Sequence, residues 1–251
     1  MPTFDRSLVY QFGFFLGKIE KAQKELVPKL TEILKDEVSG SQLPITLDEP
    51  ELATVIGTLP SGPQAKPIYV WQGGGGIWKV HFTNERLDLY FDAKGRAEIR
   101  GEMPSSLSEV GGRVIPNLRK AIDELGIIVT RPVLIQKGEA NLKREEAVKL
   151  VVDRFFGPKF RESPMAEELF ESTAKTTIRK EWRLSDDTKL PVNLIETGRA
   201  VWELRGGVGR HYLAWEFDIN GAPEVSDQTH LTGAEFEIFS NLAIQWIEEN
   251  Q

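Results

Sequence analysis

The sequence predicts an α+β fold, with an extensive antiparallel sheet and helices packed on one face. Apolar and polar residues alternate with a period of two through both middle regions, as in "GIWKVHF" and "ERLDLYFD". This alternation is typical of half-buried antiparallel strands. Stripes of apolar residues at three- and four-residue steps flank these regions and are typical of helices that lie on a sheet.

The first half of the chain begins with a predicted strand and a predicted helix. Aromatic and branched residues at 7–16 predict the strand, and an apolar stripe through about 18–38 predicts the helix, which Pro28 kinks or divides. Proline and glycine recur through 39–67, so we expect a connecting region there with at most a short strand at "LATVIG".

A meander and a closing helix complete this half. Four alternating segments predict strands at about 67–72, 76–83, 86–92 and 96–101. The closing helix is expected from about Ser106 to Leu125, with a restart at Pro116 as an open alternative, and Gly126 ends it.

The second half repeats this order. "IIVTRPVLI" at 127–135 predicts its first strand, Asn141 is the expected N-cap of a helix through "REEAVKLVVDRFFG", and Ser163 with Pro164 begins a short helix. Four strands are then expected at about 174–185, 189–196, 199–205 and 210–219. Thr232 and Glu235 form a capping box that begins the final helix. Its predicted core face consists of Phe236, Phe239, Leu242, Ala243, Trp246 and Ile247.

Both halves therefore read strand, helix, meander, helix. We expect them to be residues 1–125 and 126–251, joined in one compact unit. Local echoes such as "VWQGGGG" and "VWELRGGVG" suggest a duplication, but chance produces such echoes too. With or without a duplication, we expect one continuous antiparallel sheet built from both halves, with helices on one side.

The order of elements resembles a sporadically distributed prokaryotic family of similar length and unknown function. "GIWKVHFTNERLDLYFDA" stands where that family has its central paired strands. The resemblance is one of pattern over nearly the whole chain. It implies a strand and long helix, a proline-rich link, a central meander and a C-terminal helix, and it implies no activity.

The composition argues against several classes of function. The chain has 31 Lys and Arg against 38 Asp and Glu, a net charge of −7, and neither half is basic, so general nucleic-acid binding is not expected. Without cysteine and with three histidines, we expect no metal site and no cofactor. The longest apolar run, "LVYQFGFFLG", is too short to span a bilayer, so we expect no membrane segment and a cytoplasmic location.

Four consecutive glycines at 73–76 invite comparison with a phosphate-binding loop. Such a loop needs a helix directly after its glycines. Here Ile77 and Trp78 open a strand instead, so we expect a hairpin turn.

A second glycine turn, "RGGVGRH", gives the tentative ligand-binding residues. Trp71 and Trp202 each lie beside a glycine turn and would rim an aromatic-lined pocket between sheet and helix. The other three candidates lie at the second turn: Arg205, Arg210 and His211.

These observations favour a non-enzymatic binding or interaction protein that acts on a protein partner through its sheet surface or a sheet-helix groove. The alternative is a small-molecule-binding sensor or enzyme that uses the aromatic pocket. The sequence assigns no catalytic residue, and a homodimer stays open because exposed strand edges often pair.

Overall fold

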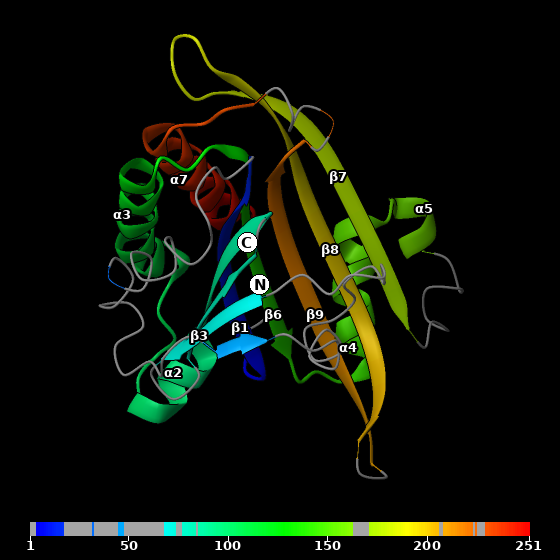
Figure 1. The fold of residues 1–251 in the computed structure, drawn as a ribbon. Coiled ribbons are helices and arrows are strands. Elements are labelled where there is room, and N and C mark those ends of the chain that lie inside the picture. The colour runs from blue at the N-terminus through cyan, green and yellow to red at the C-terminus, as the bar shows by residue number, and fades with distance from the viewer. Residues whose placement is uncertain are drawn as a thin grey trace.

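The computed structural model contains one nine-stranded sheet in which every neighbouring pair of strands is antiparallel (Figure 1). The strand order is β2-β3-β4-β5-β1-β6-β9-β8-β7. The structure describes residues 4–17, 32, 45–47, 68–73, 77–83, 85–162, 171–205, 208–222, 224 and 229–251.

The first half of the chain forms one side of the sheet. Its strands are β1 (Ser7–Leu16), β2 (Ile45–Leu47), β3 (Ile68–Gly73), β4 (Trp78–Phe82) and β5 (Arg86–Asp92). β3 and β4 pair up to Gly73 and Trp78, so the strands that flank the tetraglycine form a hairpin as expected. The predicted helix at 18–38 and the strand at "LATVIG" lie outside the described residues, and β2 was not anticipated.

The strand expected at 96–101 is wrong, because the chain forms helix α2 (Ala93–Arg100) there. The Asp92 side chain accepts a hydrogen bond from the amide of Gly95, which caps the first turn, and Gly101 ends the helix at a φ of 68°. Ala93 and Ala97 are buried one turn apart. Small apolar residues four positions apart fit one face of a helix as well as one face of a strand. The hydrogen bond from the Gly95 amide to Asp92 favours the helix.

Helix α3 (Leu107–Leu125) confirms the predicted closing helix of this half. Ser106 and Glu109 form a capping box, and Gly126 ends the helix at a φ of 61°. The helix runs through Pro116 without a restart.

The second half forms the other side of the sheet. Its elements are β6 (Val129–Ala140), α4 (Arg144–Phe155), α5 (Pro158–Arg161), β7 (Ser172–Arg183), β8 (Lys189–Arg205), β9 (Val208–Gly221) and α7 (Gly233–Asn250). The final helix begins at Thr232 with the predicted capping box, and its predicted core residues are buried or partly buried.

Two predictions for this half are wrong, and a third concerns residues that the structure does not describe. The strands expected at 189–196 and 199–205 are one strand, β8, because Gly198 continues the ladder opposite Trp215. A Cβ at Gly198 would lie 2.7 Å from Cε2 of Phe155, so close packing explains the glycine better than a turn does. Lys143, rather than Asn141, is the N-cap of α4. The short helix expected from Ser163 lies outside the described residues.

Helices α3, α4 and α7 pack on one face of the sheet, as predicted (Figure 1). The contacts are largely aromatic. Ring centroids lie 5.4 Å apart for Phe14 and Phe236, 5.4 Å for Phe155 and Trp215, and 5.9 Å for Phe217 and Trp246. The opposite side of the sheet, on which Phe15, Arg86 and Arg131 lie, carries none of the described helices, and we call it the open face for that reason alone.

The two central strands and their neighbours β5 and β9 pair in the same register in both halves. Adding 126 to both numbers of the β1–β5 pair Val9↔Asp92 gives Ile135↔Asp218, which is a β6–β9 pair. Adding 126 to Tyr10 gives Gln136, and these two residues are paired with each other between β1 and β6. A pseudo-two-fold axis therefore passes between the two central strands at this pair.

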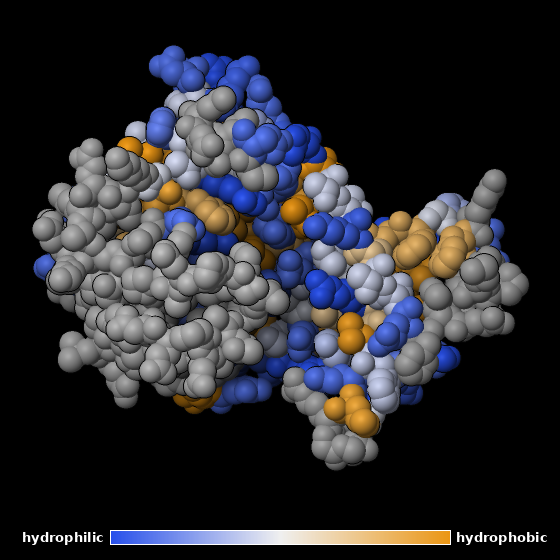
Figure 2. Space-filling model, turned by 45° about the vertical axis from the view of Figure 1, so that its right-hand side comes forward, coloured by the Kyte–Doolittle hydropathy of each residue, from blue (hydrophilic) through white to orange (hydrophobic). Residues whose placement is uncertain are grey.

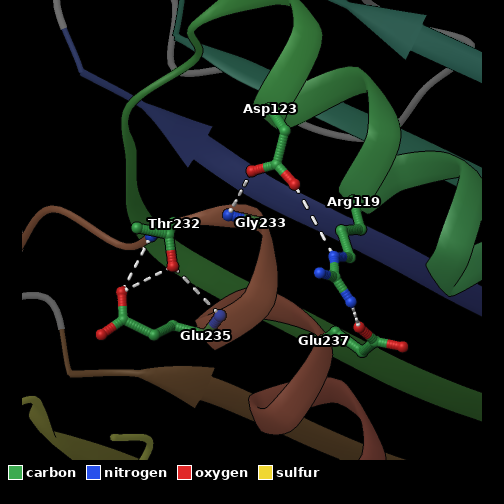
Figure 3. A network of polar contacts seen from close by, with 6 residues as sticks. All are labelled: Arg119, Asp123, Thr232, Gly233, Glu235 and Glu237. Atoms are coloured by element: carbon green, nitrogen blue, oxygen red, sulfur yellow. Dashed lines mark hydrogen bonds and ion pairs between the residues drawn. The ribbon is translucent and has the colours of Figure 1, made fainter.

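The closing helices α3 and α7 follow the same symmetry and pack antiparallel. Figure 3 shows one end of this pair, where Oδ1 of Asp123 accepts a hydrogen bond of 3.0 Å from the amide of Gly233, the first residue of α7. At the other end, Oε1 of Glu248 accepts from the amide and hydroxyl of Ser108 at 3.2 and 2.6 Å. Each helix thus satisfies amides at the N-terminus of the other.

Candidate binding surfaces of the sheet

The five predicted ligand-binding residues fall in two distant parts of the sheet. Trp71 belongs to β3, near one edge, and pairs with Val80. Trp202, Arg205, Arg210 and His211 belong to the β8–β9 hairpin on the other side. Three strands, β5, β1 and β6, lie between β4 and β9, so the two tryptophans do not rim a common opening.

Within the hairpin, the candidates are divided between the two faces. Trp202 pairs with His211, which places both on the face that carries the helices. Arg210 pairs with Glu203 and lies on the open face. Because neighbouring residues of a strand point to opposite faces, Arg210 and His211 do not converge on one ligand.

Trp202 and His211 each contact other parts of the protein. The Trp202 side chain is 40% exposed, and a Cβ at Gly209 would lie 2.8 Å from its indole ring, so the ring packs on the backbone of the adjacent strand. His211 lies near the start of α4. The pKa of Glu145 is held below its usual value by its own backbone amide first, and a smaller contribution comes from His211.

Aromatic side chains fill space between sheet and helices. Besides the pairs already given, Trp182 and Phe239 have ring centroids 5.5 Å apart. The structure places a groove of about 450 Å³ elsewhere, between α3 and α7, lined by Ser108, Gly112, Asn241, Ile244, Gln245, Glu248 and Glu249. None of these lining residues is aromatic.

The strand β7 is the outermost of the described strands on its side of the sheet. It pairs with β8 through twelve consecutive residue pairs without a shift of register, and it contains no proline. Most of its residues are exposed on both faces, and Ile178 is 44% exposed. Figure 2 shows this side of the molecule as a hydrophilic surface broken by small hydrophobic patches.

The charge of β7 is opposite to that of the whole chain. It carries Lys175, Arg179, Lys180 and Arg183 against a single acidic residue, Glu181, in a protein of net charge −7. Arg179 forms an ion pair with Glu224, and Arg183 with Asp186 at 2.9 Å. Among the described residues, Lys175 and Lys180 have no carboxylate within ion-pair distance.

The open face of the central strands holds a second concentration of polar groups. Asp88, which is 5% exposed, accepts a hydrogen bond of 2.9 Å from Gln11 and lies 2.5 Å from Nε of Arg86. Nη2 of Arg131 donates to Oδ1 of Asn220 at 2.9 Å. These groups come from three neighbouring strands, β5, β1 and β6, and from β9.

Burial shifts several pKa values on this face. It raises the pKa of Asp218, although a hydrogen bond from Asn220 acts the other way. It lowers the pKa of His81, whose ring lies 4.9 Å from that of Tyr90, and raises the pKa of the Tyr90 hydroxyl. Desolvation of charged forms explains all three directions.

Sequence reasoning did not single out either of these surfaces. The charges of β7 are visible in "AKTTIRKEWR", but only the strand order shows that this strand is an edge. Arg86 and Arg131 lie 45 residues apart, and β1 between them brings them together.

No protein-family model matches the chain, and no curated protein matches it. In the described parts of the chain, each helix is too short or too polar to cross a bilayer. Nor do the described residues include three His, Asp or Glu side chains grouped to hold a metal ion.

Proposed function

We propose that this protein is a non-enzymatic binding protein that takes up an extended, acidic segment of a partner protein along the edge of β7. The observation that supports the proposal is the length and regularity of this edge, which keeps one register over twelve residues and is exposed on both faces. An outermost strand presents unpaired amide and carbonyl groups to which another strand can add.

The charges on β7 select the kind of segment. Lys and Arg on an edge strand discourage non-specific pairing, which is their usual role. The same side chains favour a strand with glutamate or aspartate opposite them, because opposite charges across two strands stabilise their pairing. Lys175 and Lys180, on opposite faces of β7, are the two positions available for such contacts.

A second copy of the chain fits this edge less well. Two antiparallel copies of β7 would bring together eight basic and two acidic side chains. Pairing centred between Thr177 and Ile178 sets Lys175 opposite Lys180, which is repulsive. Pairing centred on Ile178 sets Lys175 opposite Glu181 and avoids this clash, but Glu181 already binds Lys189 at 3.1 Å.

Fluorescence anisotropy with three labelled peptides tests the proposal. The first alternates glutamate with valine, the second has lysine in place of glutamate, and the third has proline in place of valine. We expect the first to bind at least about tenfold more tightly than the others, since only it has both the charge and the amides of a strand. Hydrogen exchange of the complex should then show new protection of β7 amides.

Substitutions in β7 connect binding to this edge. Successive amides of a strand point to opposite sides, so one of Thr177→Pro and Ile178→Pro removes an outward amide while the other breaks the ladder to β8. We expect one of the two to lose peptide binding with little change in Tm. Lys175→Glu with Lys180→Glu should reverse the preference between the acidic and basic peptides.

Three results would contradict the proposal. They are equal binding of the proline-containing peptide, an unchanged preference after the double charge reversal, and a stable dimer in light scattering that is dissociated by whichever proline substitution leaves Tm nearly unchanged. The last would assign the edge to a second copy of the chain.

A further inference from the structure

A pair of arginines lies at one end of the central strands, on the open face and away from β7. Phe15 of β1 pairs with Arg86 of β5 on one side and with Arg131 of β6 on the other. The three side chains therefore stand in a row across adjacent strands. The guanidinium carbons of Arg86 and Arg131 lie 4.7 and 5.0 Å from the centre of the Phe15 ring.

The two guanidinium groups are unequally neutralised. Arg86 has a close carboxylate partner in Asp88, whose other oxygen accepts from Gln11, although the Nε–H of Arg86 is not aligned for a hydrogen bond to it. Arg131 donates to Asn220, which is neutral, and its buried Nε has no hydrogen-bond partner among the described residues. A buried donor without an acceptor is costly, and a guanidinium group retains its charge in proteins.

Two further carboxylates, those of Asp218 and Glu224, compensate Arg131 only in part. Burial lowers the pKa of Arg131, the charges of Asp218 and Glu224 oppose this effect, and the charge of Arg86 adds to it. Burial also raises the pKa of Asp218, which weakens its hold on a negative charge. The row thus contains two guanidinium groups beside one ring, and within hydrogen-bond or ion-pair distance of them the described residues supply one carboxylate, that of Asp88.

Another arginine on the open face, Arg6, has its charge fully compensated. Arg6 stacks on Tyr212 with its guanidinium carbon 4.0 Å from the ring centre. It also contacts two carboxylates, Glu139 at 3.1 Å and Glu203 at 2.8 Å. Arg6 therefore lies on an aromatic ring, as the arginine pair does, but its charge is balanced by carboxylates.

We propose that Arg86 and Arg131 form a binding site for an oxyanion, a carboxylate or phosphate group held beside the Phe15 ring. Arginine presents several N–H donors in a planar fork that matches both kinds of anion. An anion at this place would offset the repulsion between the two guanidinium groups. Arg86 is 30% exposed, so an anion can reach its guanidinium group from solvent, and Nε of Arg131, which is buried, would donate to the anion after a shift of the side chain.

Titration of the full chain with inorganic phosphate, and separately with acetate, tests this site by NMR of the arginine Nε–H resonances. We expect the Arg131 resonance to shift in a saturable way, with the Arg6 resonance unchanged. Saturation by phosphate alone would identify the phosphate type of ligand, and saturation by acetate alone the carboxylate type. No saturable shift of the Arg131 resonance with either anion would overturn the proposal.

Two substitutions separate the site from a general effect of charge. Arg131→Gln should weaken anion binding by about tenfold or more, the scale of one charge-assisted hydrogen bond. Arg6→Gln, which removes the same charge from a fully compensated arginine, should leave binding unchanged. Equal weakening by both variants would show non-specific attraction and refute the site, and the NMR titration of the unmodified chain decides the matter even if Arg131→Gln fails to fold.

Discussion

Two adjacent glycines of α3 provide a sharp test of how the closing helices pack. Gly111 is buried against α7, and a Cβ there would lie 2.4 Å from Cδ1 of Ile244. Gly112 is exposed, and a Cβ there would meet nothing within 4 Å. Alanine at either position gives the same gain in helix propensity, about 1 kcal/mol.

The difference between the two variants measures the contact with Ile244. Gly112→Ala should raise the free energy of unfolding by about 0.5–1 kcal/mol. In Gly111→Ala, the new Cβ lies much closer to Cδ1 of Ile244 than the separation of about 3.5–4.0 Å at which two carbon atoms pack best. Ile244 must therefore leave its rotamer, or α7 must move. Overpacking of this kind costs about 1–3 kcal/mol, which cancels or exceeds the gain.

Urea denaturation with a constant m-value is the appropriate measurement. We expect Gly111→Ala to be less stable than Gly112→Ala by about 1–3 kcal/mol, or about 2–4 °C of Tm for each kcal/mol in a chain of this size. Ile244→Val removes the clashing methyl group, so in that background Gly111→Ala should become stabilising. Equal stabilisation by the two glycine substitutions in the native background would refute this packing of α3 on α7.

Three further outcomes follow from single contacts. Asp123→Ala removes the acceptor for the Gly233 amide and should lower the free energy of unfolding by about 1 kcal/mol in chemical denaturation. Gly198→Ala forces a Cβ against the rigid ring of Phe155, so calorimetry should show a loss of about 1–3 kcal/mol. Burial raises the pKa of Asp218 in the folded state, so its protonation stabilises the fold at low pH and this contribution is lost as pH rises through the folded pKa. Asp218→Asn should accordingly gain stability relative to the unmodified protein as pH rises from below the ordinary aspartate pKa, and a parallel pH profile for the two proteins would contradict the raised pKa.

Short-range signals in the sequence predicted most of the architecture. The predicted capping box of α7 lies within four residues, and the alternation in β4 and β5 is complete within each strand, so these elements are confirmed close to their expected bounds. The capping box of α3 is as local, but it was not singled out in the sequence. The errors arise where a residue that is distant in the sequence determines the local structure. Gly198 is glycine because Phe155 packs on it, and nothing in "ETGR" distinguishes that reason from a turn.

The candidate surfaces were harder to foresee for the same reason. Glycine turns and nearby arginines suggested a ligand site at the β8–β9 hairpin, but the alternation of side chains separates Arg210 from His211. Arg86 and Arg131 carry no local signal, since their proximity requires β1 to pair with both β5 and β6. Strand order therefore decides both surfaces, and single-sequence periodicity does not determine strand order.

The place of β1 and β6 at the centre of the sheet has a consequence for synthesis of the chain. β1 is made first, and its partner β6 begins more than a hundred residues later. Until then, one edge of β1 remains open on a half-sheet that β5 has already joined. The β6 strand of another nascent molecule has the same sequence and register, so domain swapping through this central seam is the misassembly that the topology favours at high concentration.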